Sequence, residues 1–407
     1  MFAQYSDRII KPGLERLKSF LNKLGNPQNK FNTVLVGGTN GKGSTVAFLF
    51  HMLSALGLKT GGYLSPHLFN LEERVLLSVP GAKELPRIFE EMEKKSLDWK
   101  IELTPFELLT ASIFVLFNNC GIDLAILEVG MGGRWDATNV TSPLVSIITS
   151  LGLDHTQFLG STITTIAEEK FPIARQERPL ILGNIPLTGL KVLREKGKSL
   201  ETKIYEWRKD FFAIGRDRDF CYVGDHIVPH IALAMEGSHQ WVNASLALKA
   251  VELLDLPVNG CVVEGLKRAW LPGRMQVEKV KGVSVVLDVA HNPLALGVLI
   301  GGLRKRFGNR PVWVFLRLLK DKPRREFLKM AQKAFEKVYF LEVARDDDRA
   351  LSPTSALAEV GMEPRVFSFE RQGKRILEKA RKEEAVLVFT GSFGAVKEAM
   401  SWLNGLK

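Results

Sequence analysis

The chain has 407 residues, of which 45% are hydrophobic and 25% charged, so it is long enough to bury a large core and to form two or more globular domains. Its three cysteines lie far apart without a CxxC pair, which excludes a disulfide scaffold and a zinc knuckle and indicates reduced thiols. A formal net charge of +11 favours an anionic ligand, namely nucleic acid, nucleotide phosphates or a polyanionic small molecule. Asp7 and Arg8 stand where a signal peptide would place its apolar core, and no run of about eighteen apolar residues occurs, so we expect a soluble, cytoplasmic protein.

The first half of the chain alternates short apolar runs with amphipathic segments, which predicts a βα series. Helices are expected near residues 7–24, 43–57 and 105–119, and strands near 32–36, 59–63, 122–127 and 144–150. The stretch IDLAILE is apolar almost throughout, which is typical of a parallel strand buried on both faces.

Helical periodicity fades over residues 203–232, where glycine and aspartate interrupt apolar runs. This pattern predicts antiparallel hairpins and therefore a small β insertion. Helices are expected to follow near 239–254 and 259–269.

The segment LPGRM, 271–275, combines proline and glycine and is predicted to be a hinge. We place a linker at 271–276, between domains of residues 1–270 and 277–407. A second βα series follows the linker. It has expected strands at 283–288, 311–316, 337–343 and 385–389 and helices that include 323–336 and 371–382.

The stretch VGGTNGKGSTVAFLF, 36–50, places four glycines around Lys42 between a predicted strand and a predicted helix. Backbone N–H groups of such a turn converge on an anion, and the start of the helix adds positive potential. Lys42 is expected to reach the β and γ phosphates of a nucleotide, and the hydroxyl of Ser44 to bind Mg²⁺. The usual pattern has serine or threonine directly after the lysine, whereas Gly43 intervenes here. The alternative is a glycine-rich turn without a ligand.

GTNGKGS resembles the ATP loop of the Mur ligase superfamily, and LGNPQ just upstream resembles its folylpolyglutamate synthase branch. Further matches occur in the family's order, mostly over residues 14–293. They are GYLSPHL at 62–68, TPFE at 104–107, EVGMGGRWDATN at 128–139, LDHTQFLG at 153–160, EEKFPIAR at 168–175, LPGRM at 271–275, DVAHNP at 288–293 and TGS at 390–392.

The resemblance implies an α/β protein of two domains. The first would be a P-loop mononucleotide-binding domain with a small β insertion, and the second a Rossmann-like domain. The implied activity is ATP-dependent addition of L-glutamate to folates through an acyl phosphate, with dihydropteroate as a further possible acceptor. It also implies ATP and two Mg²⁺ ions as ligands, a monomer, and no nucleic-acid or membrane partner.

Site residues follow from the resemblance. Those implied for the nucleotide are Thr39, Asn40, Gly41, Lys42, Gly43, Ser44, Asn243, Arg274, Asp288 and His291. Those implied for the metals are Ser44, Ser65, Glu128, His155 and Lys170, of which His155 and Lys170 also count with Lys42 as catalytic. Those implied for the pterin are Phe106, Trp135, Asp136 and Ala137.

Glu128 and His155 follow predicted parallel strands, and ligands bind at the carboxyl ends of such strands. The resemblance assigns Ser44, Ser65 and Glu128 to one metal, and Glu128 and His155 to the second. Each has an alternative role. Glu128 could cap a helix or form an ion pair, His155 could be a hydrogen-bonded structural residue, and Ser65 could bond locally in a turn.

Lys170 lies in an acidic AEEK turn, where the alternative is an exposed lysine paired within its helix. In the family the corresponding lysine is carbamylated, which turns a cation into an anion that helps to hold the second Mg²⁺. Phe171 and Pro172 replace the family's small residue and glycine.

The resemblance implies that Arg274 of the linker binds phosphate, that Asp288 of the second domain binds the ribose, and that Asn243 of the first domain lies near the adenine. The alternatives are a hinge ion pair, a strand-end cap and a helix-surface amide. His291 would approach the γ phosphate or orient its loop. The family's DKD stretch is represented by DKP, 321–323, which leaves the contacts of that loop open. Phe106 would stack on the pterin or pack in the core, and Asp136 would make a polar contact.

Three rival functions stay open. A ligase of peptidoglycan precursors would generally carry a separate N-terminal domain, yet only about 35 residues precede the loop. A nucleic-acid-dependent NTPase would use the positive charge but needs interleaved aromatic and basic residues, which do not stand out. A regulatory nucleotide-binding protein would need Lys42 but neither Glu128 nor Lys170.

Overall fold

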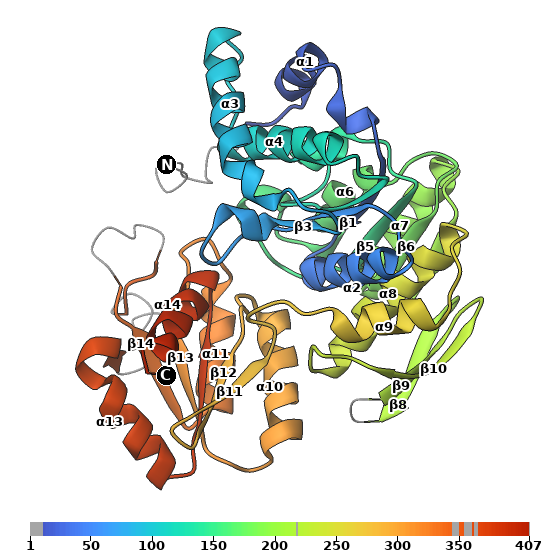
Figure 1. The fold of residues 1–407 in the computed structure, drawn as a ribbon. Helices are drawn as coiled ribbons and strands as arrows, with labels where there is room; N and C mark the ends of the chain where they lie inside the picture. Colours follow the sequence, from blue (N-terminus) through green and yellow to red (C-terminus); the bar gives the residue numbers. More distant parts are fainter. Residues whose placement is uncertain (1–10, 217–218, 344–349, 354–359, 362–364, 407) are drawn as a thin grey trace. The chain divides into compact units, whose positions relative to one another are not determined.

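The computed structural model describes residues 11–216, 219–343, 350–353, 360–361 and 365–406, which form two compact units (Figure 1). The first unit comprises Met1–Gly152, Thr162–Ala234 and Gln240–Trp270. The second comprises Leu153–Ser161, Met235–His239 and Leu271–Lys407. Two short segments, 153–161 and 235–239, therefore group with the second unit although their neighbours in sequence belong to the first. Residues 271–276 stay a predicted hinge.

The first unit is built on a seven-stranded sheet with the order β3-β2-β4-β1-β5-β6-β7. Its strands are β1 Asn32–Gly37, β2 Thr60–Tyr63, β3 Val75–Leu77, β4 Leu124–Glu128, β5 Val145–Ser150, β6 Leu180–Asn184 and β7 Ile204–Glu206. Only β3 runs antiparallel to its neighbour. Strand β1 lies between β4 and β5, with Val36 in register with both Glu128 and Ile147. Because these strands are parallel, the segments that leave β2, β4, β1 and β5 emerge at one edge of the sheet.

Helices cover this sheet and place the connecting loops. They are α1 Glu15–Lys23, α2 Lys42–Ala55, α3 Leu85–Asp98, α4 Pro105–Asn119, α6 Ile163–Lys170, α7 Leu187–Ser199, α8 Ser238–Leu253 and α9 Gly260–Arg268. Helix α4 starts where the sequence dictates, because Thr104 and Glu107 form a capping box and Pro105 takes the first helical position. Helix α2 is buried over most of its length and packs against α9.

One predicted helix was too long. Helix α1 begins at Glu15, whereas the periodicity predicts a helix from residue 7; residues 7–10 lie outside the described ranges and 11–14 are not helical. Pro12 and Gly13, with φ of 104° at the glycine, explain the late start, because neither favours a helix interior.

The predicted β insertion is present but shorter than expected. Strands β8 Phe212–Arg216, β9 Asp219–Val223 and β10 Ile227–Ala232 form a separate antiparallel sheet. The segment near 204, predicted as part of the insertion, instead pairs parallel to Leu180–Leu182 as β7. Its three residues extend the main sheet rather than the hairpins.

The second unit has a six-stranded sheet with the order β11-β12-β16-β13-β14-β15. Its strands are β11 Gln276–Val280, β12 Val283–Leu287, β13 Val312–Leu316, β14 Lys337–Leu341, β15 Val366–Phe367 and β16 Val386–Thr390, and only β11 is antiparallel to its neighbour. Its helices are α5 Thr156–Leu159, α10 Pro293–Phe307, α11 Arg324–Ala334, α13 Phe369–Lys382 and α14 Phe393–Asn404. The two sheets confirm the predicted α/β fold, with a Rossmann-like second domain.

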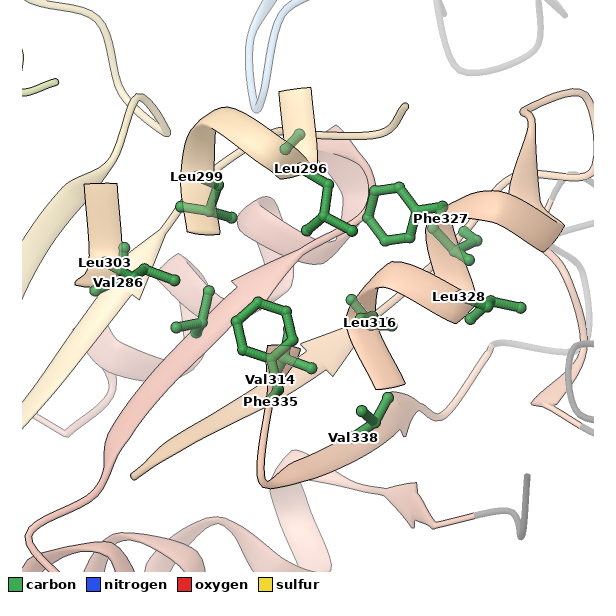
Figure 2. Packing of buried hydrophobic residues seen from close by; sticks show 14 of the residues in the cluster. Val286, Leu296, Leu299, Leu303, Val314, Leu316, Phe327, Leu328, Phe335 and Val338 are labelled. Atoms are coloured by element: carbon green, nitrogen blue, oxygen red, sulfur yellow. The ribbon is translucent and has the colours of Figure 1, made fainter. Parts of the chain in front are cut away.

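Alternating residues of β13 and β16 pack on opposite faces of this second sheet. Val314 and Val388 belong to the core formed with α10 and α11, whose leucines and phenylalanines are shown in Figure 2. Phe315 and Phe389 stack on each other at 4.7 Å on the other face, where Phe389 also lies 5.5 Å from Phe369 of α13. The sheet is therefore buried on both faces, and its polar groups gather where its strands end.

Candidate nucleotide and metal site

The loop between β1 and α2 is shaped by two glycines with positive φ. Gly38 has φ of 136° and Gly41 has φ of 89°. A Cβ at Gly38 would overlap the hydroxyl oxygen of Thr149 and lie 3.0 Å from its backbone nitrogen. A Cβ at Gly41 would overlap the side-chain oxygen of Asn243. These two positions therefore need glycine so that β5 and α8 can approach the loop.

Hydrogen bonds from the end of β5 hold the loop in place. The Thr39 N–H donates to Ser150 O at 2.8 Å, and the Thr39 hydroxyl accepts from Gly152 N at 3.0 Å. The Asn40 N–H donates to Ser150 Oγ at 3.0 Å, while the Thr149 hydroxyl donates to Asn40 O at 2.7 Å. A loop fixed by its neighbours does not have to reorganise when an anion arrives.

Two lysine ammonium groups converge on one carbonyl oxygen of this loop. Lys42 Nζ lies 3.3 Å from both Gly38 O and Thr39 O, and Lys170 Nζ lies 3.0 Å from Gly38 O. Lys170 is the last residue of α6 and only 4% exposed, so the expected turn and the alternative of an exposed lysine are both wrong. The positive charge of Lys42 beside a glycine-rich loop attracts phosphate.

Glu128 ends β4 and is 5% exposed. Its Oε2 accepts a hydrogen bond from Ser65 N at 3.0 Å, which joins the ends of β4 and β2. Within the residues that the structure describes, no three His, Cys, Asp or Glu side chains are grouped as a ready metal site. The donors at this edge are instead one buried carboxylate and serine hydroxyls, which fit a hard cation such as Mg²⁺ that keeps places for phosphate and water.

The segment that carries Lys170 is braced by a half-buried arginine. Arg175 donates at 2.8 Å to Asn139 Oδ1 and to Thr141 O, and at 3.0 Å to Pro172 O. A second contact joins the same segments, because Arg134 Nε lies 3.1 Å from Glu169 Oε1. The loop after β4 and the end of α6 are thus held together, and the position of Lys170 follows from both.

The predicted pterin residues fall into two groups. Phe106 is half-buried, and its ring centroid lies 6.0 Å from that of Tyr63. The side chains of Phe106 and Asp136 both lie next to Gly130, because a Cβ added to that glycine would touch both of them. Trp135 is 52% exposed, whereas Ala137 is buried.

Asp136 is committed to its own loop. Its carboxylate accepts hydrogen bonds from the N–H groups of Met131 and Thr138 and from the Thr138 hydroxyl. Burial raises the pKa of Asp136, and these hydrogen bonds oppose that shift.

Asn243 lies on α8 and is buried against the nucleotide loop beside Gly41. Its Nδ2 donates to Gln240 Oε1 at 2.9 Å, so the alternative of a helix-surface amide is wrong. The amide borders the loop that we expect to bind the nucleotide.

In the second unit, Asp288 closes the turn after β12. Its carboxylate accepts hydrogen bonds from Met275 N at 2.7 Å and from Ala290 N at 2.8 Å. These are the contacts expected if Asp288 caps the end of the strand, which was the alternative to a role in ribose binding. Burial raises the pKa of Asp288, and the nearby guanidinium of Arg274 opposes that shift. Arg274 also lies over the ring of Phe393 at 5.6 Å. The turn therefore holds a half-buried carboxylate next to an arginine.

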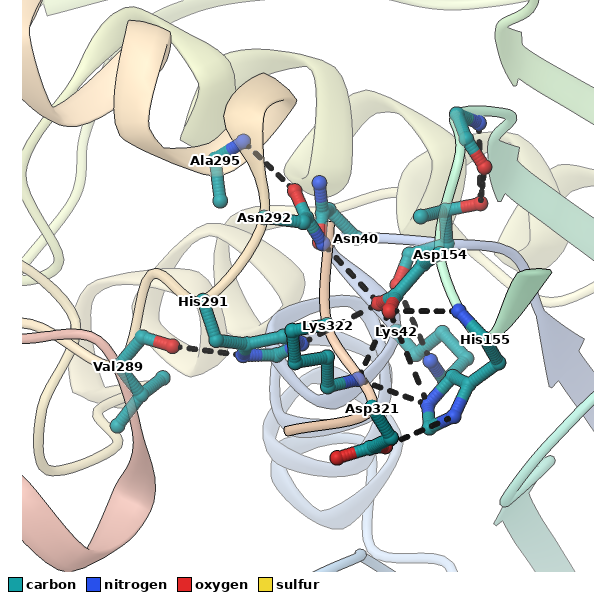
Figure 3. Close-up of polar contacts among 12 residues, drawn as sticks. Asn40, Lys42, Asp154, His155, Val289, His291, Asn292, Ala295, Asp321 and Lys322 are labelled. Atoms are coloured by element: carbon teal, nitrogen blue, oxygen red, sulfur yellow. Dashed lines mark hydrogen bonds and ion pairs between the residues drawn. The ribbon is translucent and has the colours of Figure 1, made fainter. Parts of the chain in front are cut away.

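His155 belongs to a compact polar cluster of the second unit (Figure 3). Its Nε2 lies 2.9 Å from Lys322 Nζ, and Asp154 lies 2.8 Å from the same ammonium group. Burial, reinforced by the charge of Lys322, lowers the pKa of His155 to about 4, so its imidazole is neutral at neutral pH. His291 joins the cluster, with Nδ1 2.8 Å from Val289 O.

Four residues of these clusters were not singled out from the sequence. They are Thr149, Ser150, Asp154 and Arg175. Asp154 and Arg175 do lie within the motifs LDHTQFLG and EEKFPIAR that the resemblance rests on, so their place in these motifs was the available signal. Thr149 and Ser150 gave only the weaker signal of hydroxyls at the end of a predicted strand.

Replacing Gly38 with alanine is expected to lower the free energy of unfolding by about 2–4 kcal/mol, because the added methyl group would overlap Thr149 on a backbone with positive φ. Urea unfolding of the full chain measures this loss. Gly260→Ala is the matched control, since a Cβ there meets nothing within 4 Å and alanine favours the helix that Gly260 begins. Equal stability of the two variants would contradict the tight contact between β5 and the loop.

Comparisons with known proteins give a consistent result. The family model of the Mur ligase middle domain matches residues 36–251, and that of the Mur ligase glutamate ligase domain matches 273–393. The chain is 33% identical to the dihydrofolate synthase/folylpolyglutamate synthase of Escherichia coli over 406 residues, covering 98% of this chain and 92% of that protein. It also resembles solved structures. These include E. coli FolC in complex with DHPP and ADP (TM-score 0.88, 30% identity, 99% and 96% of the chains covered). A second is the bifunctional folylpolyglutamate synthase/dihydrofolate synthase of Yersinia pestis with AMPPNP and Mn ion (TM-score 0.87, 29% identity, 99% and 96% covered).

No helix in the described part of the chain is both long and apolar enough to cross a bilayer.

Proposed function

Because the chain belongs to the folylpolyglutamate synthase/dihydrofolate synthase family of Mur ligases, we propose that it is an ATP-dependent ligase that joins L-glutamate to a folate carboxylate. The observation that carries this proposal is the convergence of Lys42 and Lys170 on the carbonyl of Gly38, with the buried carboxylate of Glu128 at the end of the neighbouring strand. A regulatory nucleotide-binding protein would need the loop but not a buried lysine and a buried carboxylate beside it.

In the first step a folate carboxylate oxygen attacks the γ phosphorus of ATP. A P–O bond forms to the carboxylate, the bond between the γ phosphorus and the bridging oxygen breaks, and ADP leaves. The loop N–H groups and the ammonium of Lys42 would stabilise the negative charge that builds up on the phosphoryl oxygens. No side chain has to act as a nucleophile.

In the second step the neutral amine of L-glutamate attacks the carbonyl carbon of the acyl phosphate. The C–N bond forms, the C–O bond to phosphate breaks, phosphate leaves, and the amine loses its proton. The acyl phosphate is reactive toward water, so closure of the second domain about the predicted hinge at 271–276 would protect it. Arg274, Asp288 and His291 would approach the nucleotide on closure.

We propose two divalent metal positions. Ser44, Ser65 and Glu128 would hold one Mg²⁺, and Glu128, His155 and a carbamylated Lys170 the second. Bound there, Mg²⁺ would neutralise phosphate charge and favour in-line transfer. Support comes from the buried carboxylate of Glu128 at the end of β4 and from its hydrogen bond to Ser65 N, which brings Ser65 to the same edge of the sheet.

Carbamylation of Lys170 has its own test. We expect ¹³C-bicarbonate to give a carbamate NMR signal in the full chain that is lost in Lys170→Ala, together with glutamate-dependent ADP release. The physical reason is that a buried ammonium cannot bind a metal, whereas its carbamate can. Lys191→Ala, which removes an exposed lysine of α7, should keep both. An active wild-type protein without this signal would contradict the modification.

For the acceptor, Phe106 and Trp135 would contact the pterin ring, with Asp136 and Ala137 shaping the loop beside it. The relation to bifunctional proteins, including one solved with DHPP, supports dihydropteroate as a second acceptor.

We also propose that the protein is a cytoplasmic monomer whose ligands are these small molecules, without a nucleic-acid or membrane partner.

The test is direct. Purified protein is incubated with ATP, Mg²⁺, L-glutamate and either tetrahydrofolate or dihydropteroate, and the products are weighed by mass spectrometry. We expect one added glutamate with either acceptor and longer products with tetrahydrofolate. ATP consumption without any glutamylated product would contradict the proposed function.

A further inference from the structure

An open cavity of about 560 Å³ lies in the second unit, between the hairpin of β11 and β12 and the last turn of α10. Its wall contains three basic residues and one acidic residue. The lining residues are Val277, Glu278, Lys279, Ser284, Arg306, Phe307 and Arg310. Small-molecule sites typically have volumes of about 300–1,000 Å³, so the cavity is large enough for a small organic ligand.

This cavity lies at the opposite edge of the second sheet from the residues predicted to meet the nucleotide. Ser284 lies near the start of β12, whereas Asp288 follows its end, about 13 Å further along the strand. Phe307 ends α10, and Asn292 caps the start of that helix about 22 Å away. Within the second unit, the cavity is therefore separate from the proposed ligase site.

The hairpin supplies two polar groups to the cavity. Lys279 and Ser284 are directly opposite each other in the antiparallel register of β11 and β12, so their side chains lie on the same face. Lys279 is exposed, whereas Ser284 is only 5% exposed and still lines the cavity. Among the residues that the structure describes, neither side chain has a hydrogen bond or an ion pair. Both groups are thus available to a ligand.

The segment after α10 supplies an oriented guanidinium. Arg310 Nε donates to Glu384 O at 2.9 Å, which fixes the plane of the group. The guanidinium carbon also lies 5.8 Å from the ring centroid of Phe307. Within the described ranges, neither NH₂ group of Arg310 has a hydrogen bond or an ion pair. Most of its donors therefore remain for a ligand, although contacts with the protein already hold the group in place.

The other two charged residues of the wall are already engaged. Arg306 forms an ion pair with Glu236. Glu278 Oε1 accepts a hydrogen bond from Gln276 Nε2 at 2.8 Å. Because Glu278 directly precedes Lys279 in β11, the alternation of the strand turns the two side chains to opposite faces. The groups left for a ligand are therefore two cations and one hydroxyl.

We propose that this cavity is a second anion site, which binds a phosphate group through Lys279, Ser284 and Arg310. A guanidinium matches a phosphate by donating two parallel hydrogen bonds, and the ammonium adds a compact positive charge. Val277 and Phe307 give the wall an apolar part, which suits a phosphate ester with a small hydrophobic body. The inference does not rest on the proposed ligase activity, because it concerns other residues and its test measures binding alone.

Isothermal titration calorimetry of the full chain with inorganic phosphate and with phenyl phosphate tests the site. The background is Lys42→Ala, so that the nucleotide loop contributes little to phosphate binding. We expect one equivalent of phenyl phosphate to bind. Arg310→Met and Lys279→Met should each weaken this binding at least about tenfold, since each removes a charge-assisted contact. Tighter binding of phenyl phosphate than of inorganic phosphate identifies an ester as the ligand, whereas equal affinities identify free phosphate.

Two variants serve as safeguards. Lys279→Met keeps the proposal testable even if Arg310→Met does not fold, because Lys279 is exposed. Arg375→Met is the matched control, since it removes an exposed positive charge of α13 in the same unit, and it should bind phenyl phosphate as its parent does. With Lys42 intact, Lys279→Met and Arg310→Met should keep the wild-type rate of ADP release.

Three outcomes would overturn the inference. One is phenyl phosphate that binds Arg310→Met and Lys279→Met as tightly as it binds their Lys42→Ala parent. Another is an equal loss in Arg375→Met, because binding would then follow the net charge of the protein rather than the cavity. The third is binding to the wild type that disappears in Lys42→Ala, which would assign the phosphate to the nucleotide loop. None of these outcomes bears on the ligase activity, which the glutamylation assay tests by itself.

Discussion

Replacing Lys42 with alanine is expected to lower glutamate-dependent ADP release about a hundredfold to a thousandfold. The ammonium of Lys42 lies at the start of α2, next to two carbonyl oxygens of the loop, and no other lysine of the loop can take its place. It would stabilise negative charge on the phosphoryl group during transfer, so its loss raises the barrier of the first step. A coupled assay of ADP release, with and without L-glutamate, measures the effect.

The stability of this variant should change little, because Lys42 contacts only backbone oxygens at 3.3 Å. We expect less than about 1 kcal/mol in urea unfolding. Lys59→Ala is the matched control, since it removes one exposed lysine that precedes β2 in the same unit. Wild-type rates for Lys42→Ala would show that the loop does not handle the reacting phosphate.

Replacing Glu128 with glutamine is expected to weaken divalent-metal binding at least about tenfold and to lower ADP release about a hundredfold or more. Glutamine keeps an oxygen that can accept from Ser65 N, so the ends of β4 and β2 should stay joined. The change therefore removes a negative charge without removing the hydrogen bond. Mn²⁺ titration in the presence of AMPPNP and the ADP assay report the two effects separately.

The control for charge loss is Glu264→Gln on the exposed face of α9, where the carboxylate pairs with Lys267. This variant should bind Mn²⁺ and turn over as the wild type does. If Glu128→Gln matched the control in both assays, the carboxylate at the end of β4 would not be a metal ligand.

Strongly patterned segments of this chain were predictable from the sequence. Helix α4 occupies 105–119 as predicted, because a capping box and a proline start it and its apolar residues continue without interruption. Buried parallel strands such as β4 and β16 were equally clear, since their apolar runs leave no alternative. Strand β11 was not predicted, because its polar alternation, QVEKV, is a weak signal until β12 pairs with it.

The site was predictable where one motif carries its own chemistry. The spacing of glycines around Lys42 identified the loop, but the sequence could not show that Lys170 is buried, because that depends on Arg175 and on the loop after β4. The burial of Asp154 was also hidden. Its side-chain partners Asn292 and Lys322 lie more than a hundred residues away, and nothing local indicates that an aspartate before His155 is buried.

The central claim is that the loop at 38–44 and the side chains at the ends of the neighbouring strands bind a magnesium nucleotide and activate a carboxylate. A crystal structure of the full chain with AMPPNP and Mg²⁺ tests it most directly. We predict triphosphate oxygens at the loop N–H groups and at Lys42, with a metal bound to Ser44 and Glu128. Nucleotide bound elsewhere in the crystal, or Glu128 without a metal in a nucleotide-loaded site, would contradict it.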